Sequence, residues 1–435
     1  MASWAWGLTF IPTSVATLLP EPAVPVTALQ GASIITGKPA SALSYSGGTM
    51  VMRFDNSSGK YTPGGGGTYH GARFIGVEVK LYADVTGSGA PSWTHGAPAV
   101  FTGVVTNVAW TYRSAFESYM TVTVADRLTM LATLSFEDVD SGNGLDIGAG
   151  SASAALTATL VAANAITDVI DQTSILNPSG DVGESLQAIT DYRGTAGALA
   201  GRIEQSDGGD VFVRHGLPIA AAPNDYNALT FRTRGQKPIS ESVTGVTGLY
   251  ALNLWDTSLS SSGDEPHSFG SVDFVAGAAM AYSQVEFQSV GGTAQRETSP
   301  TAAIDLYGGR SITRSGLYAA SDAATLSLAE AFLDRYGVRT VPPVSVQSIS
   351  MPPVVTGDND GWQLTKYSIG DACTINYDPA GASAAIEIQG VISGVSWAIT
   401  PSSATMTISL EDGDQTVSLI MDSAIYGILD TNRLG

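Results

Sequence analysis

Val100–Asp126 reads VFTGVVTNVAWTYRSAFESYMTVTVAD, and this stretch decides the fold. Apolar and polar residues alternate in it twice, on either side of a short polar break at Arg113–Ser118. A period of two is typical of a strand with one buried face, and a polar break between two such runs is typical of a hairpin. The stretch therefore predicts two antiparallel strands that share a core.

Ile388–Asp412 repeats this pattern near the other end of the chain, as IQGVISGVSWAITPSSATMTISLED. The same residue types recur at matching distances in Gly103 and Gly390, Trp110 and Trp397, Met120 and Met406, and Asp126 and Asp412. Any two amphipathic hairpins look somewhat alike, but the shared Gly, Trp and Met favour a common structure. We therefore predict a repeated structural unit, with the glycines as turn positions and the tryptophans as core positions.

Composition limits the possible functions. The 435 residues include 20 Lys plus Arg against 40 Asp plus Glu, a formal net charge of −20, and 49 glycines. Sparse charge and many small residues are typical of a β-rich globular protein. Nucleic-acid affinity depends on Lys and Arg that displace cations from phosphates, so the charge predicts no sequence-specific nucleic-acid partner. An acidic wall would suit a conduit along which DNA passes without adhering.

The cysteine content and the apolar runs indicate whether the chain is expected to be secreted or inserted in a membrane. Cys373 is the only cysteine, which excludes an intrachain disulfide and predicts a small buried residue in a strand. The first 37 residues contain no Lys or Arg, and prolines interrupt their apolar runs, so no secretory signal is predicted. Polar residues in the Ala-rich run Ser151–Ile170 make it a poor membrane span, and we expect no stable membrane insertion.

Turn signals and shifts of composition divide the chain into four predicted domains. Residues 1–136 hold an N-terminal arm and a first β-barrel, and residues 137–225 form a small α+β domain. Residues 226–300 form a β-rich middle domain, and residues 301–435 form a second β-barrel with a flanking helix at 322–336. The predicted fold class is mainly β with α+β insertions, in which two related barrels flank a smaller helix-containing region.

Three local features lead to more specific expectations. The first 30 residues are either an arm that packs on a neighbour or on the chain's own barrel, or simply a first strand and a loop. The run Ser151–Gln172 has apolar residues on one helical stripe and predicts a helix. For the helix at 322–336 we expect an N-cap at Ser321 or Asp322, a C′ residue at Gly337, and an inward face formed by Leu326, Ala329 and Leu333.

No constellation of residues points to catalysis. The four histidines lie in Gly- and Pro-rich stretches without partners at metal-ligand spacing, and we expect solvated loop residues at His70, His95, His215 and His267. The acidic run Asp358–Asp360 resembles the start of a calcium loop but lacks its later ligands. Neither a nucleophile elbow nor a catalytic Ser-x-x-Lys frame occurs. The sequence predicts no enzyme, no catalytic residue, no cofactor and no metal.

A turn and a hairpin ending carry a resemblance to a known family. The turn motif comprises Asp55, Asn56, Gly59, Tyr61 and Pro63, and the hairpin ends in DRLTML, Asp126–Leu131. Together they resemble the N-terminal barrel of the tail hub (baseplate hub or minor tail) proteins of long-tailed bacteriophages. In that family the turn typically reads Asp-Asn-x-x-Gly-x-Tyr-x-Pro, and the hairpin ends in Asp-Arg-Leu-x-x-Leu. The block 302–347 and the ending ILDTNRLG, 428–435, are also similar to that family.

The resemblance implies a structural role in a phage tail tip. It implies tail-tube-like barrels and a homotrimeric ring that joins a sixfold tube to a threefold tip and lets DNA pass. It also implies contacts with a tail-tube or distal tail protein, a tape-measure protein and other tail-tip proteins. The expected location is the virion tail tip, after synthesis in the cytoplasm of the host bacterium.

Two alternatives remain open. Trp110 and Trp397 could stack on sugars, as expected of a carbohydrate- or receptor-binding tail protein that serves host attachment. A tail enzyme that degrades peptidoglycan is disfavoured, because neither a metal set nor a nucleophile frame is present.

Overall fold

The computed structural model describes most of the chain, with gaps between the described segments. These segments are residues 5–11, 24–25, 29–38, 43–63, 74–84, 99–114, 117–137, 143–166, 175–176, 183–215, 227–234, 252–255, 267–269, 271–276, 282–299, 309–337, 344–351, 367–377, 386–400 and 404–412. The glycine run at 64–67, the acidic run at 358–360 and the ending at 428–435 lie outside them.

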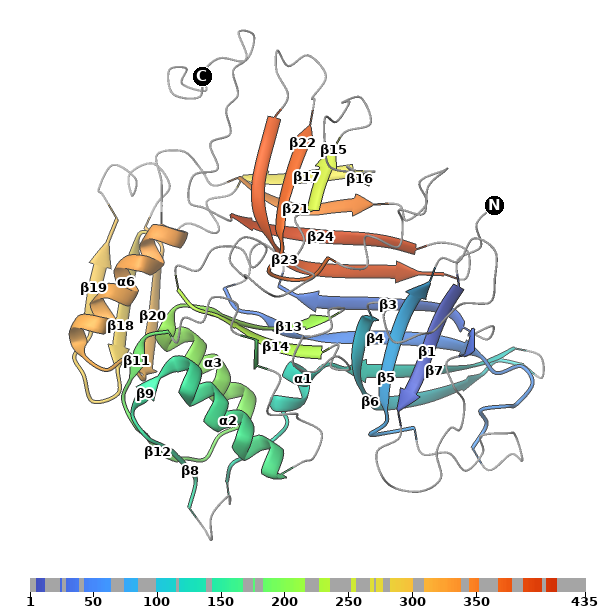
Figure 1. Ribbon diagram of the computed structural model, residues 1–435, viewed down its shortest axis with the longest axis horizontal. Coiled ribbons are helices and arrows are strands. Elements are labelled where there is room, and N and C mark those ends of the chain that lie inside the picture. Colours follow the sequence, from blue (N-terminus) through green and yellow to red (C-terminus); the bar gives the residue numbers. More distant parts are fainter. Residues whose placement is uncertain are drawn as a thin grey trace.

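One large sheet dominates the described structure, and both ends of the sequence contribute strands to it. Its fourteen strands are β1 (Ala5–Ile11), β2 (Val24–Pro25), β3 (Leu29–Gly37), β4 (Ser46–Asp55), β5 (Glu78–Asp84), β6 (Ala99–Tyr112), β7 (Ser118–Ala125), β15 (Leu252–Trp255), β16 (His267–Ser268), β17 (Ser271–Ala276), β21 (Val344–Met351), β22 (Ala372–Tyr377), β23 (Ile386–Ile399) and β24 (Ala404–Asp412). The hydrogen-bonded order is β17-β21-β24-β23-β3-β4-β7-β6-β5-β1-β2, and β23 also starts a branch, β22-β15-β16. In Figure 1, β24, β23, β3, β4 and β7 lie one below another across the middle of the molecule.

Strict alternation along the strands places one face of this sheet in a core. In β4 the side chains of Met50, Met52 and Phe54 are buried, and those of Val51 and Arg53 between them are exposed. Buried side chains from β3, β4, β6, β7, β23 and β24 belong to a single hydrophobic cluster. The two halves of the chain therefore share one core.

A second layer of helices and short strands packs beside the sheet, in green at the lower left of Figure 1. It contains α1 (Arg127–Leu131), β8 (Leu145–Ile147), β9 (Gly150–Ser151), α2 (Ala152–Ile166), β10 (Ile175–Leu176), β11 (Ser185–Leu186), β12 (Ile189–Tyr192), α3 (Ala196–Asp207), β13 (Asp210–His215) and β14 (Asn227–Arg232). It has its own hydrophobic cluster, to which α2 contributes Leu156, Leu160 and Ala163 from the predicted stripe.

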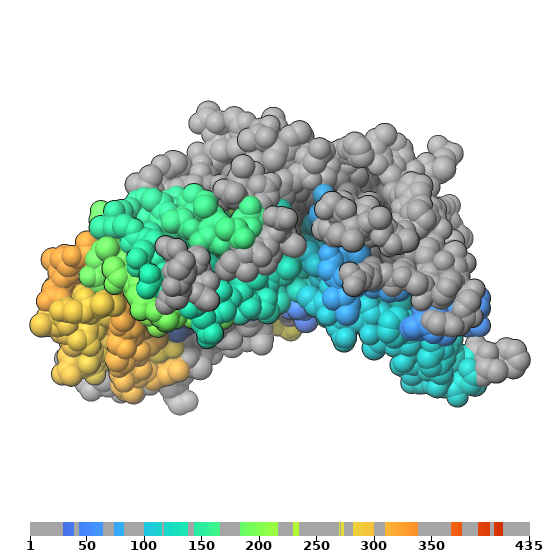
Figure 2. Space-filling model, turned by 90° about the horizontal axis from the view of Figure 1, so that it is seen from below, coloured from blue at the N-terminus to red at the C-terminus, as the bar shows by residue number. Residues whose placement is uncertain are grey.

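A third unit consists of β18 (Gln284–Ser289), β19 (Gln295–Thr298), β20 (Ser311–Leu317) and α6 (Asp322–Tyr336). These three strands form a sheet of their own, and α6 packs on it through Thr325, Leu328, Ala329 and Phe332. Figure 2 shows this unit, in yellow and orange, at one end of an arched molecule, and the blue and cyan surface of the N-terminal strands at the other.

Most local predictions agree with the structure. The predicted hairpin is present as β6 and β7, the Ala-rich helix is present as α2, and Cys373 is buried in β22. At the N-terminus a strand is present, because β1 pairs antiparallel with β5, and the N-terminal arm stays a prediction. A mainly β fold is confirmed, but no barrel closes among the described strands, so the two barrels stay a prediction. The domain boundaries also stay a prediction.

The helix at 322–336 is confirmed, with two corrections. Its N-cap is Ser321, whose Oγ accepts from the Ala324 N–H at 3.2 Å. The inward face includes Ala329 but not Leu326, which is only partly buried, since Leu328 and Phe332 face the sheet instead. Gly337 is the C-cap residue rather than the expected C′ residue, and its conformation is extended (φ −75°). Its N–H still satisfies the Leu333 carbonyl, at 2.7 Å.

No helix among the described residues is long and apolar enough to cross a membrane.

Candidate functional site: the repeated strands and their junction

The two hairpins recognised in the sequence have the same register. Trp110 lies opposite Met120 across the β6–β7 pair, and Trp397 lies opposite Met406 across the β23–β24 pair. Both pairs also contain a register shift at the same place, between Val105 and Asn107 in one and between Ile392 and Gly394 in the other. A shared bulge at one position is strong support for a structural repeat, because bulges are specific features of a strand.

The same hydroxyl contact occurs at both bulges. Thr106 donates through Oγ1 to the Thr123 carbonyl at 3.3 Å, and Ser393 donates through Oγ to the Ser409 carbonyl at 3.2 Å. In each hairpin the acceptor belongs to the residue opposite the first residue after the bulge.

The repeat extends well beyond the hairpins. The pairs β3–β4, β4–β7 and β5–β6 recur as β17–β21, β21–β24 and β22–β23, all antiparallel. The turn before β5 also recurs before β22, with Gly76 at φ 85° and Gly370 at φ 90°. These two N–H groups donate to the Val105 and Ile392 carbonyls, at 2.9 and 2.8 Å. The only sequence signal for this turn is the dipeptide Ile-Gly at 75–76 and 369–370.

The two predicted glycines occupy equivalent close approaches rather than turns. A Cβ on Gly103 would lie 2.4 Å from the Ala125 carbonyl oxygen, and a Cβ on Gly390 would lie 2.8 Å from the Glu411 carbonyl oxygen. Ala125 and Glu411 are themselves equivalent, because they lie opposite Val104 and Val391. Glycine is needed at both sites because no other side chain leaves room for the adjacent strand.

The two tryptophans differ in environment. Trp397 is 4% exposed and belongs to the shared core, whereas Trp110 is only partly buried at the edge of that core. The indole N–H of Trp110 donates to the Tyr61 carbonyl at 2.7 Å. Trp397 is therefore too deeply buried to stack on a sugar.

The motif turn folds around a buried asparagine and supports Trp110. Asn56 is fully buried, and its Oδ1 accepts from the Tyr61 N–H at 2.8 Å. Asp55 accepts from the Ser57 N–H and hydroxyl, and Gly59 adopts φ 70°, the left-handed region that favours glycine. Pro63 is exposed where the described part of the turn ends. Thus the structure brings together two predicted sites, the turn and Trp110.

The two halves of the chain meet through paired main chains. The second half of β23 pairs antiparallel with β3, and the register runs from Gly394–Gly37 to Ile399–Ala32. Gly37 has φ 82°, and a Cβ there would lie 2.3 Å from the Ser393 carbonyl oxygen. Next to it, the Lys38 N–H donates to that same carbonyl at 2.8 Å.

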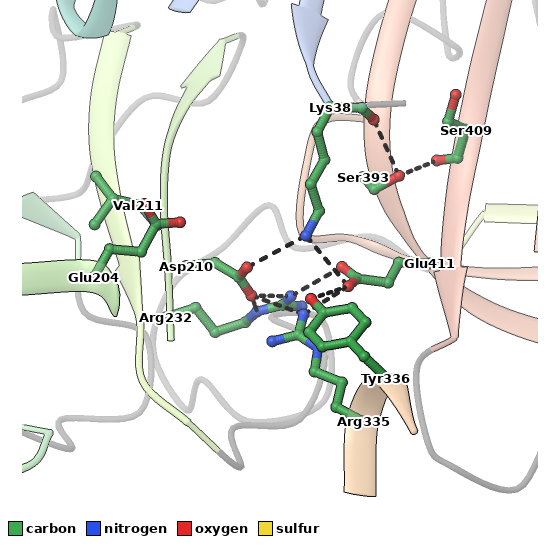
Figure 3. A network of polar contacts seen from close by, with 10 residues as sticks. All are labelled: Lys38, Glu204, Asp210, Val211, Arg232, Arg335, Tyr336, Ser393, Ser409 and Glu411. Carbon is green, nitrogen blue, oxygen red and sulfur yellow. Dashed lines mark hydrogen bonds and ion pairs between the residues drawn. The ribbon is translucent and has the colours of Figure 1, made fainter. Parts of the chain in front are cut away.

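A buried charge cluster closes one end of this junction (Figure 3). Lys38 Nζ lies 3.2 Å from Glu411 Oε1 and 3.5 Å from Asp210 Oδ1. Arg232 binds the Asp210 carboxylate at 2.5 Å, and Arg335 reaches Asp210 at 3.1 Å and Glu411 at 2.8 Å. The cluster thus joins the segment after β3 to β13, β14, α6 and β24, so it links both halves to the two smaller units. No pattern in the sequence marks these five residues as neighbours.

The charges of the cluster stabilise one another. Burial disfavours the charge on Lys38, but the Glu411 and Asp210 carboxylates outweigh this effect and raise the pKa of the amine. Burial likewise opposes ionisation of Asp210, but Arg335, Arg232 and Lys38 together lower its pKa. Three cations and two carboxylates therefore remain ionised in the interior.

Glu204 lies beside this cluster and behaves differently. It is buried in the last turn of α3, and its Oε1 accepts from the Val211 N–H at 3.3 Å. Burial, and then the negative charge of Asp210, raise the pKa of Glu204 to about 8. Its carboxyl group is therefore mostly protonated at neutral pH.

This shift predicts a pH-dependent stability. Above the unfolded pKa of 4.5 the unfolded chain loses the Glu204 proton, whereas the folded chain keeps it until about pH 8. The group therefore destabilises the fold increasingly between these values, by up to about 1.4 kcal/mol per pH unit. Glu204→Gln should remove this loss, so its melting temperature should rise relative to wild type from pH 5 to pH 9. Glu330→Gln, on the exposed side of α6, controls for the lost charge. A difference independent of pH would contradict the assignment.

Strand β13 connects the helical layer to both halves of the sheet. Arg214 donates to Asp371 at 2.8 Å, and both side chains are buried. His215 accepts through Nδ1 from the Thr102 N–H at 3.3 Å and stacks on Phe101, with centroids 4.6 Å apart. The prediction of a solvated loop histidine is therefore wrong for His215. Burial, followed by the charge of Arg127, lowers its pKa to about 3, so the ring is neutral.

Within the described segments, no group of three or more His, Cys, Asp or Glu side chains could hold a metal ion.

Solved structures with the same fold include two tail proteins. A tail protein from Neisseria meningitidis MC58 is similar over 94% of this chain and 97% of its own, with a TM-score of 0.57 and 12% identity. The 43 kDa tail protein of prophage MuSo2 from Shewanella oneidensis is similar over 96% and 99%, with a TM-score of 0.54 and 13% identity. The sequence matches no protein-family model and no curated protein. The chain thus has the fold of these tail proteins over nearly its whole length.

Proposed function

We propose that three copies of this chain form a hub ring in a bacteriophage tail tip. The observation that carries the proposal is the internal repeat, in which β3, β4, β7, β6 and β5 correspond to β17, β21, β24, β23 and β22. A chain with two related units gives six such units in a trimer. A ring of this kind can meet a sixfold tube on one side and a threefold tip on the other.

The proposed partners follow from this position. On one side the ring contacts the tail-tube or distal tail protein, and it also contacts the tape-measure protein and other tail-tip proteins. The protein is made in the cytoplasm of the host bacterium and is then part of the virion. Its role is structural rather than enzymatic.

The solvent-facing side of the sheet supports passage of DNA through the ring. On β3, β4 and β7 this side carries mainly hydroxyl and aliphatic side chains, namely Ser33, Ile35, Thr49, Val51, Arg53, Thr121 and Thr123. Arg53 is the only cation in this set, and its guanidinium carbon lies 3.7 Å from the centroid of the Tyr119 ring. In the proposed ring this side lines the lumen, where few groups hold phosphate.

The experiment that tests the proposal is a mass measurement of the purified full chain, followed by imaging of tail tips without imposed symmetry. We expect three chains per particle and density for six related units around a channel. A protein that is monomeric at every concentration and absent from tail tips would contradict the hub. A glycan array tests the attachment alternative, and specific binding would favour it.

A further inference from the structure

The second half of β6 is an unpaired edge with a buried counterpart elsewhere in the chain. Beyond the bulge, Asn107–Tyr112 pair on one side with β7, and no strand pairs with their other side among the described residues. The equivalent residues of β23, Gly394–Ile399, pair with β24 on one side and with β3 on the other. An edge of this kind presents main-chain donors and acceptors that a further strand can satisfy.

The side chains in the second half of β6 are also less covered than their counterparts in β23. Tyr112 is 55% exposed, whereas its counterpart Ile399 is 3% exposed. Val108 and Trp110 are partly buried, whereas their counterparts Val395 and Trp397 are 7% and 4% exposed. Since the two hairpins share register and bulge, the difference follows from β3, which lies beside β23 but has no equivalent beside β6.

The chain carries the strand that fits this edge. β17 corresponds to β3. Val272 of β17 lies opposite Ile349, which lies opposite Ile408 of β24. In the same way Ala32 of β3 lies opposite Met52, which lies opposite Val122 of β7, the equivalent of Ile408. In the described part of the chain β17 pairs with only one strand, β21. It is the last strand at one end of the hydrogen-bonded order, and six strands separate it from β6. A second copy of the chain is therefore the partner that can bring β17 to β6.

We propose that Asn107–Tyr112 of one copy pairs antiparallel with β17 of a second copy, in the register that β23 and β3 already show within the chain. Because Ile399 lies opposite Ala32, and Val272 corresponds to Ala32, this register places Tyr112 opposite Val272. The contact is head-to-tail, so each copy offers β6 to one neighbour and β17 to the other, and repetition closes a ring. The proposal rests on the hub function and names the interface by which the ring forms.

The exposed edge is accessible at the surface. Figure 2 shows the surface of the strands that include β6 at one end of the arched molecule, in cyan. The contact can form on the surface of the folded chain, because Tyr112 on this edge is 55% exposed. It would cover Tyr112 and the open side of Trp110, as β3 covers Ile399 and Trp397.

Cysteine cross-linking of the full-length protein tests both the contact and its register. Directly opposed side chains in an antiparallel pair have Cβ atoms about 4.5–5.5 Å apart, close to the reach of a disulfide. Tyr112→Cys/Val272→Cys should therefore give covalent dimers and larger species on oxidation. Tyr112→Cys/Ser271→Cys is the matched control, because neighbouring residues of a strand point to opposite faces. The native Cys373 is buried and should contribute no cross-link.

The outcomes separate the interface from the hub function. Cross-linking by Tyr112→Cys alone would show β6 pairing with itself and overturn the proposal. A wild-type trimer with no cross-link in the Tyr112/Val272 pair would overturn this interface but leave the hub intact. A monomer at every concentration, with no cross-link in any variant, would overturn both.

A substitution at the edge provides an independent measurement. Tyr112→Asp should keep the wild-type melting temperature, because the side chain is exposed, and should abolish the oligomer seen by mass. Val290→Asp, at a position that is 49% exposed in the turn after β18, should leave the oligomer unchanged. An oligomer that survives Tyr112→Asp would count against the interface.

Discussion

Asp210→Ala should lower the free energy of unfolding by about 3–5 kcal/mol, the range measured when one partner of a buried ion pair is removed. Asp210 is 3% exposed and accepts from Arg232 at 2.5 and 3.1 Å and from Arg335 at 3.1 Å, with Lys38 at 3.5 Å. Without it, three cations would share only Glu411. Because the cluster joins five segments, the loss should be cooperative and visible as one shift in thermal melting.

Two further variants distinguish unpaired charge from lost packing. Glu117→Ala removes an exposed ion pair with Arg113, in which both side chains are more than half exposed, and should cost about 0–1 kcal/mol. Asp210→Leu/Arg232→Met should be less harmful than Asp210→Ala, since removing both charges leaves fewer groups unpaired. A cost for Asp210→Ala below that of Glu117→Ala would mean that water reaches the cluster.

Acid should weaken the same cluster. The folded-state pKa values of Asp210 and Glu411 lie below their ordinary values, so both carboxylates stabilise the fold above about pH 4. This contribution is lost as the pH falls through the folded pKa values. Glu204 acts in the opposite direction, since its raised pKa weakens the fold as the pH rises towards 8. Both effects favour maximal stability in mildly acidic solution.

Features set by local periodicity were the predictable part of this fold. Alternation in Val100–Asp126 and Ile388–Asp412 predicts both hairpins, and the helical pattern at 322–336 predicts α6 nearly to the residue. These patterns are local because a strand or helix buries one face regardless of its partner. The buried face of α6 was misjudged by one position, since two adjacent apolar stripes exist and only packing selects between them.

Features set by contacts between distant segments could not be predicted. Lys38 and Glu411 are 373 positions apart, and nothing in the sequence around either residue marks it as buried. The correspondence of β3 with β17 was likewise invisible, because a strand ladder is held by main-chain groups that leave little trace in the sequence. Only the Ile-Gly dipeptides before β5 and β22 could have extended the repeat beyond the hairpins.

Trp397→Ala should cost about 3–5 kcal/mol, as for a large aromatic residue in a core, and Trp110→Ala should cost clearly less. The reason is the unequal covering of two equivalent positions. Trp397 is 4% exposed between β24 and β3, whereas Trp110 has β7 on one side and an open edge on the other. Thermal melting of the two variants under conditions where the wild-type chain is monomeric measures this difference.

Assembly should reverse the ranking for Trp110. If β17 of a second copy covers this position, Trp110→Ala should weaken the oligomer far more than it weakens the fold, because the indole loses contacts that exist only in the ring. Trp397→Ala should weaken the fold, and it should weaken the oligomer only as a consequence of that lost stability. The measurement is the dissociation midpoint of the oligomer for each variant, compared with its melting temperature as a monomer. The two substitutions could instead lower the melting temperature of the monomer equally, with no added effect of Trp110→Ala on assembly. That result would mean that the two positions are covered alike within one chain.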